Sequence, residues 1–217
     1  MRIVNFSKEN SLVSQYMTEL RDVGQHDDSM RFRNNLCRIA EIMAYEISRT
    51  LNYVVKKIET PLAQTDATVI DDEIVLATIF RAGLPFHQGF LNFFDRAQNA
   101  FVSAYRKYKE RGDFEVCIEY LASPKLERKT LILCDPMLAT GISMDMSYRA
   151  LLTKGIPKKI HLASVVASEQ AVQYVSEVFP QESTTLWVGA IDPKLNEHSY
   201  IVPGLGDAGD LAFGVKE

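Results

Sequence analysis

The sequence predicts an α/β fold, a parallel twisted sheet flanked by helices, and two observations lead to that prediction. From Glu73 onward, short apolar runs rich in β-formers alternate with amphipathic stretches of helical length. Strand–helix units of this length place parallel strands in one sheet and helices on both of its faces. The 217 residues contain no internal repeat and no Pro- or Ser-rich linker, so we expect a single domain, 1–217.

The first sixty residues (1–60) are predicted to form a helical N-terminal region. One candidate helix spans Ser11 to Asp22, and a longer one spans Met30 to Asn52. In the longer helix, apolar residues fall mostly at three- and four-residue steps: Phe32, Leu36, Ile39, Ile42, Met43, Ile47 and Leu51. Such a stripe is a packing face, either against the rest of the chain or against another subunit.

The middle of the chain predicts a buried strand and a hairpin arm. Ile74 to Phe80 is an apolar run that ends abruptly at Arg81. The arm (99–121) consists of strands at Ala100–Tyr105 and Phe114–Leu121, with the charged segment 106–113 as its turn.

Regular strand–helix alternation continues in the second half. Strands are expected at Thr130–Cys134, Lys159–Val166 and Thr184–Val188, and helices at Ile142–Lys154 and Ser168–Phe179. Because ligands of parallel sheets bind at the carboxyl ends of the strands, the loops after these strands are candidate binding loops.

Composition excludes several classes of function. Lys plus Arg number 24 and Asp plus Glu number 28, a net charge of −4 that argues against a nucleic-acid partner. The chain has no apolar run of about 18 residues and no signal-like start, so we expect a cytoplasmic protein with no membrane contact. The three cysteines form no C-x-x-C pair and the four histidines show no ligand spacing, so no protein-built metal site is expected.

The strongest local pattern is DPMLATGIS, Asp135 to Ser143, between an apolar strand and a helix. A short loop that leads into a helix presents backbone N–H groups to one point, which suits a phosphate. Gly141 permits close approach of the backbone, and Asp135 suits the hydroxyls of a sugar. The alternative is an ordinary helix cap with a turn glycine. The loop has no G-K-[ST] and is not a Walker loop.

Two further segments have unusual chemistry. Pro203 to Asp210 combines a proline, three glycines and two aspartates, a composition that fits neither a helix nor a regular strand. It suits a loop that turns main-chain donors and acceptors inward, and a tight surface turn is the alternative. Arg81, beside two small residues, can hold a diphosphate through paired hydrogen bonds, or it can simply cap a surface turn.

These motifs together resemble one family. DPMLATGIS resembles the signature DPMLATGGS of uracil phosphoribosyltransferases, which belong to the type I phosphoribosyltransferases. Arg81–Leu84 resembles the family's RAGL loop, and Tyr200–Asp210, with Leu195–His198 before it, resembles the family's uracil-binding segment. The likeness covers roughly residues 60 to 217.

The resemblance implies transfer of ribose 5-phosphate from phosphoribosyl diphosphate (PRPP) to uracil, which makes UMP and diphosphate. It implies Mg²⁺ as cofactor, a homodimer or higher homo-oligomer, and a uracil-binding hood at 195–217. Asp207 and Arg81 become the implied catalytic residues. The implied PRPP ligands are Arg81, Arg106, Asp135, Pro136, Met137, Leu138, Ala139, Thr140, Gly141, Ile142, Ser143 and Asp207. The implied uracil ligands are Ile201, Gly206, Asp207 and Ala208.

Departures from the family pattern leave rival functions open. Ile142 replaces a glycine of the family's loop, Pro85-Phe86 replaces Gly-Met, and the chain ends in FGVKE where the family has FGTK. The rivals are a transferase for another base, an RNA-binding pyrimidine regulator and a catalytically silent nucleotide sensor. A regulator needs a basic face, and the dense basic runs here are short.

Overall fold

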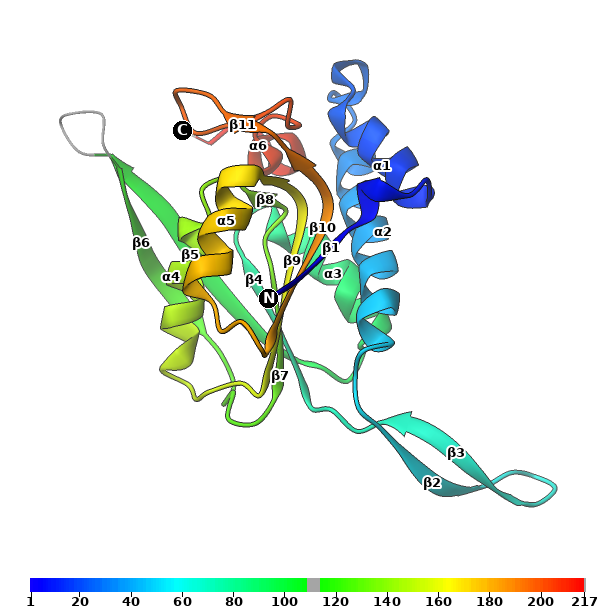
Figure 1. The fold of residues 1–217 in the computed structure, drawn as a ribbon. Coiled ribbons are helices and arrows are strands. Elements are labelled where there is room, and N and C mark those ends of the chain that lie inside the picture. The colour runs from blue at the N-terminus through cyan, green and yellow to red at the C-terminus, as the bar shows by residue number, and fades with distance from the viewer. Residues whose placement is uncertain (109–113, 217) are drawn as a thin grey trace.

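A computed structural model describes residues 1–108 and 114–216, with the backbone alone for residues 104–108 and 114–117. Its centre is an eight-stranded sheet in the order β1-β10-β9-β7-β4-β5-β6, with the short β8 paired to β9 (Figure 1). The strands are β1 (Arg2–Asn5), β4 (Ile74–Ile79), β5 (Gln98–Tyr108), β6 (Phe114–Ala122), β7 (Thr130–Cys134), β8 (Met137–Leu138), β9 (Lys159–Ser168) and β10 (Thr184–Asp192). All the pairs are parallel except β5 with β6, so the predicted parallel α/β fold is confirmed.

Helices cover both faces of the sheet. On one face lie α1 (Leu12–Arg21), α2 (Ser29–Ser48) and α3 (Gly83–Phe93), and on the other α4 (Ile142–Leu152) and α5 (Glu169–Val178). Each face has its own apolar core, the first around Leu36, Phe86 and Trp187 and the second around Leu131 and Leu151. No helix in the described part of the chain is long and apolar enough to cross a membrane.

Two strands in the centre of the sheet explain where a site can form. Every residue of β4 and β7 is buried, because both faces of these strands are covered by helices. Polar groups are therefore accommodated at the strand ends. Arg81 follows β4 and Asp135 follows β7, so both lie at the same carboxyl edge.

The N-terminal region is less helical than predicted. Residues Arg2–Asn5 form β1, which pairs with Thr185–Val188 and extends the sheet by one strand. The long helix ends at Ser48 rather than Asn52, and Tyr53 begins strand β2. Short β-branched segments such as these take their structure from a partner strand, which helical periodicity does not reveal.

A hairpin that the sequence did not predict projects from the body of the molecule (Figure 1). It is formed by β2 (Tyr53–Glu59) and β3 (Gln64–Ile70), paired in an antiparallel register. Most of its residues are exposed, including the apolar side chains of Val55, Ile58 and Leu62. An isolated two-stranded hairpin with an exposed apolar surface is at best marginally stable in water.

The predicted hairpin arm is present as β5 and β6. Strand β5 is longer than predicted, because the ladder continues through Arg106, Lys107 and Tyr108, which pair with Val116, Glu115 and Phe114. Arg106 is thus a strand residue and not part of a turn. The rest of the predicted turn, 109–113, lies outside the described residues.

The C-terminal segment crosses the carboxyl edge of the sheet (Figure 1). It contains a small antiparallel pair, β11 (Lys194–Leu195) with β12 (Ile201–Val202), and the short helix α6 (Ala208–Phe213). Short helical turns at Phe6–Lys8 and Val23–Gln25 complete the fold.

Candidate active site

A cavity of ≈ 620 Å³ opens at the carboxyl edge of the sheet. Four separate segments line it: the end of β4 with the turn that follows, strand β5 at Ser103, the loop after β7 and the C-terminal segment. Its lining includes Arg81, Asp135, Ser143, Ile201 and Asp207. The cavity therefore joins residues that lie far apart in the sequence.

The loop after β7 is fixed by hydrogen bonds to the neighbouring strand β9. The carbonyl of Pro136 accepts from the amides of Val165 and Val166 at 3.1 and 3.0 Å. The hydroxyl of Ser168 donates to the carbonyl of Ala139 at 2.5 Å. These hydrogen bonds attach the loop to β9 at two places.

Gly141 gives this loop its sharp entry into α4. Its φ of +83° is a left-handed conformation, and a Cβ there would lie 2.7 Å from Cδ1 of Tyr174. The N-cap residue of α4, Gly141, has no side chain with which to cap the helix, and the Thr140 hydroxyl accepts a long hydrogen bond of 3.4 Å from the Ile142 amide. A second hollow of ≈ 20 Å³ lies within this loop, lined among others by Thr140, Gly141 and Ser143. Uncapped amides beside such a hollow suit an anion.

The C-terminal segment presents a second well-defined group, the carboxylate of Asp207. One of its oxygens accepts from the amides of Gly209 and Asp210 at 2.9 and 3.0 Å, which caps α6. Its other oxygen lies 3.4 Å from Nζ of Lys216. Burial raises the pKa of Asp207, but the amide hydrogen bonds and the Lys216 charge outweigh burial, so the net pKa is lowered. The carboxylate is therefore ionised at neutral pH and able to accept a proton or a hydrogen bond.

The cations beside the cavity are paired with residues of the C-terminal segment. Arg81 donates to Asp210 at 2.6 Å and to the carbonyl of Gly214 at 3.1 Å. Lys216 forms an ion pair with Asp207. Both pairs are partly exposed, so an incoming anion of higher charge can compete for the two cations.

The structure brings most of the predicted site residues together. The large cavity is lined by Arg81, Asp135, Met137, Ala139, Ser143, Ile201, Gly206, Asp207 and Ala208. Leu138, Thr140 and Gly141 line the small hollow instead. Pro136 and Ile142 line neither, and the side chain of Arg106 lies outside the described residues.

Sequence reasoning missed other residues that line the cavity, chiefly Ser103, Tyr200 and Lys216. Lys216 belongs to the terminal FGVKE, which resembles the family's FGTK, and that likeness was the signal by which it could have been found. Ser103 reaches the cavity through the sheet order, because β5 is the neighbour of β4. No sequence pattern marks that proximity.

Cys134 does not behave as a nucleophile, although it directly precedes Asp135. It is buried and its Sγ donates to the carbonyl of Ala77 at 3.2 Å. Burial raises the pKa of its thiol to about 12, so the thiolate is absent at neutral pH. The prediction that Cys134 ends a strand is confirmed.

The site offers few protein ligands for a metal ion. Among the described residues, no three His, Cys, Asp or Glu side chains come together in a group that could hold one. Asp135 and Asp207 do line the cavity and offer carboxylate oxygens, the ligand type that Mg²⁺ prefers. These donors fit a Mg²⁺ ion only if a bound substrate supplies most of its oxygen ligands.

The comparisons with known proteins agree with this geometry. The profile of the family described as uracil phosphoribosyltransferase matches residues 7–215. A uracil phosphoribosyltransferase of Porphyromonas gingivalis is 56% identical over 216 residues, with 100% of both chains covered. One from Pyrococcus furiosus is 35% identical over 210 residues, covering 95% of this chain and 88% of the relative.

Solved structures show the same fold. The AQ2163 protein from Aquifex aeolicus is similar with a TM-score of 0.87 and 28% identity, over 98% of each chain. A hypoxanthine phosphoribosyltransferase from Staphylococcus aureus shares the fold at 12% identity, with a TM-score of 0.50 over 75% of this chain and 76% of that one. Given the match over residues 7–215, the chain belongs to the uracil phosphoribosyltransferase family.

Proposed function

We propose that this chain transfers ribose 5-phosphate from PRPP to N1 of uracil, producing UMP and diphosphate. The observation that carries the proposal is the shared cavity. It joins a loop suited to a sugar phosphate, around Ala139 and Ser143, to a segment suited to a planar base, around Gly206 and Asp207.

PRPP is proposed to bind across the loop after β7. The uncapped amides at the start of α4 would receive its 5′-phosphate, and Asp135 would receive the ribose hydroxyls. The guanidinium of Arg81 would leave its ion pair with Asp210 and bind the diphosphate instead, because the diphosphate carries more negative charge. Mg²⁺ is proposed to enter with the diphosphate, where it neutralises negative charge, with most of its ligands supplied by PRPP and water.

Uracil is proposed to bind against Ile201 and the turn Gly206–Ala208. Uracil presents alternating acceptors and donors on its edge, which main-chain groups can match without charged side chains. Cytosine reverses part of that pattern and would leave polar groups unpaired, so it should be rejected.

The reaction is a displacement at C1′ of the ribose. The bond from C1′ to the diphosphate oxygen breaks as the bond to N1 of uracil forms, and positive charge develops on the sugar ring. Protein groups act by position and charge rather than by a covalent nucleophile. The ionised Asp207 orients the N1 proton or accepts it, directly or through water.

We further propose that the protein is located in the cytoplasm and forms a homo-oligomer. Its substrate and product are phosphorylated and do not cross membranes unaided, which supports an internal location. The exposed apolar side chains of the β2–β3 hairpin, among them Val55, Ile58 and Leu62, support a second copy of the chain as their partner. A Leu62→Glu, Val55→Glu variant should show a smaller mass than the wild-type protein in light scattering, and equal masses would contradict this assignment.

The decisive assay incubates the purified protein with Mg²⁺, PRPP and, separately, uracil, cytosine, hypoxanthine or orotate. Release of diphosphate and UMP with uracil alone is the expected result. Release with another base would assign a different substrate. Release with none would favour a sensor or regulator and would overturn the proposal.

A further inference from the structure

The C-terminal segment is joined to the N-terminal helix α1 through one buried carboxylate. Asp192, at the end of β10, accepts a hydrogen bond from each of the two terminal nitrogens of Arg21, both at 2.8 Å. The same carboxylate accepts the amide of Gly204 at 2.8 Å. Arg21 also donates to the carbonyl of Gly204 at 2.9 Å, so the two side chains hold both polar groups of that residue.

Gly204 is a sensitive point at which to hold the segment. Its φ is +59°, and a Cβ there would lie 2.1 Å from the carbonyl oxygen of Ile201. Its backbone is therefore folded tightly onto Ile201 on one side, and Gly206 follows closely on the other. Because Ile201 and Gly206 both line the cavity, the position of Gly204 sets the position of the surface that the base would meet.

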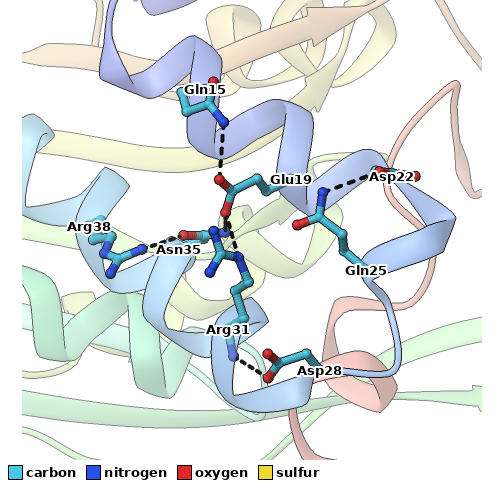
Figure 2. A network of polar contacts seen from close by, with 8 residues as sticks. All are labelled: Gln15, Glu19, Asp22, Gln25, Asp28, Arg31, Asn35 and Arg38. Atoms are coloured by element: carbon cyan, nitrogen blue, oxygen red, sulfur yellow. Dashed lines mark hydrogen bonds and ion pairs between the residues drawn. The ribbon is translucent and has the colours of Figure 1, made fainter.

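Arg21 and Asp192 do not themselves line the cavity. Arg21 lies at the end of α1, and α1 is anchored to α2 by a polar network centred on Glu19 (Figure 2). Glu19 accepts from Arg31 at 2.9 Å, from Asn35 at 2.8 Å and from Gln15 at 3.1 Å. These hydrogen bonds lower the pKa of Glu19 to about 2, so the carboxylate remains charged at neutral pH. The guanidinium of Arg21 is thus attached to a helix that is itself fixed.

We propose that Arg21 and Asp192 are positioning residues for the base side of the reaction. They hold Gly204 so that Ile201 and the Gly206–Ala208 turn keep the geometry that uracil requires, and they leave the phosphate loop untouched. The inference rests on the proposed function for its kinetic readout, but its structural content can be measured without any activity.

The test is Arg21→Lys, which keeps the positive charge but cannot contact both oxygens of Asp192 and the Gly204 carbonyl together. The KM for uracil should rise about tenfold while the KM for PRPP changes less than about twofold, as expected when charge-assisted hydrogen bonds are lost on one side only. Asp192→Asn keeps an oxygen for the Gly204 amide and should give a smaller rise. Arg49→Lys, which alters an exposed pair with Glu46, is the matched control and should leave both constants unchanged.

Hydrogen exchange supplies the second readout. In Arg21→Lys, amides of residues 201–208 should exchange at least about fivefold faster, while those of 135–143 keep the wild-type rate. Equal rises in both KM values, or unchanged exchange in 201–208, would overturn the positioning role. If the wild-type protein transfers nothing to uracil, the proposed function fails, and the exchange experiment still decides whether Arg21 holds the segment.

Discussion

The two sides of the cavity are built in different ways. The proposed phosphate side, residues 135–143, directly follows the buried strand β7 and is hydrogen-bonded to β9, the next strand in the sheet. The base side contains little regular structure and is held by side chains from α1 and α2, over 170 residues away in sequence. The phosphate side thus depends mainly on the backbone of β9, together with the Ser168 hydroxyl, and the polar contacts of the base side come from a few distant side chains.

This difference teaches where each half of the site is vulnerable. Backbone hydrogen bonds between buried strands survive most side-chain changes, so a change that alters the backbone should damage the phosphate side most. On the base side, side chains such as Arg21 and Arg33 supply the polar contacts that hold the segment, so changes at these positions far from the cavity should reach it.

Gly141→Ala should nearly abolish activity, because the new Cβ meets Tyr174 and the backbone is strained at φ +83°. We expect kcat/KM for PRPP to fall by at least about 1000-fold, since small displacements of a binding loop have large kinetic effects. Gly24→Ala, where φ is not positive, is the control and should behave as wild type. Substantial activity in Gly141→Ala would show that the loop after β7 tolerates a shift, and it would count against the proposal that this loop binds the phosphate.

Asp207→Asn should lower kcat by about 100-fold with a smaller change in KM for PRPP, because the amide keeps the cap of α6 but cannot accept a proton. Steady-state assays with uracil measure both constants. Asp95→Asn, an exposed aspartate away from the cavity, is the control. An Asp207→Asn enzyme with full kcat would remove Asp207 from the chemistry and leave it as a helix cap.

Acidification should destabilise the face of the sheet that carries α1 and α2. His161 is buried there and accepts from Trp187 Nε1 at 3.1 Å, and burial lowers its pKa from 6.5 to about 3. The folded state therefore binds fewer protons than the unfolded state between these values, so stability falls as pH drops below about 6.5. This group alone should remove about 2 kcal/mol between pH 7 and pH 5. Urea unfolding at both pH values, compared with His161→Gln, measures it, and equal slopes in the two proteins would contradict it.

Arg33→Met should produce the smallest change. Arg33 donates to the carbonyl of Ala212 at 2.7 Å, and its guanidinium lies 5.9 Å from the ring centroid of Phe213, so it holds the end of α6 rather than the base turn itself. The KM for uracil should rise about threefold with no change for PRPP, the scale of one modest hydrogen bond. Arg38→Met removes a neighbouring guanidinium that contacts Tyr16 and Asn35 instead, and it should not separate the two constants. An equal response of both variants would mean that loss of helix packing, not of the Ala212 contact, is being measured.

The same contrast explains what could be predicted from the sequence. The strand Thr130–Cys134 was predicted with the bounds that the structure gives, because a buried parallel strand is a continuous apolar run. The helix after it began where predicted, at Ile142, because Gly141 marks the turn. Both features are encoded by adjacent residues.

Other features could not be predicted because their causes are distant. Neither Arg21 nor Asp192 lies in a recognisable sequence motif, and only the fold reveals that both contact Gly204. Strand β1 forms because β10 offers it an edge, and the β2–β3 hairpin has too few buried residues to leave an apolar pattern. Lys216 approaches Asp207 only once α6 has turned the chain back toward the cavity.

The contacts of Arg21 and Arg33 with residues 204 and 212, far away in sequence, have a consequence for folding during synthesis. The helices that bear these arginines, α1 and α2, are synthesised before residues 192–212, so the arginines are present before the segment that they contact. A chain interrupted near residue 190 would contain the strands from β1 to most of β10 and the loop 135–143, but it would lack residues 200–210, against which we propose that the base binds. The proposed base side can therefore form only after residues 192–212 have been synthesised and have docked onto α1 and α2.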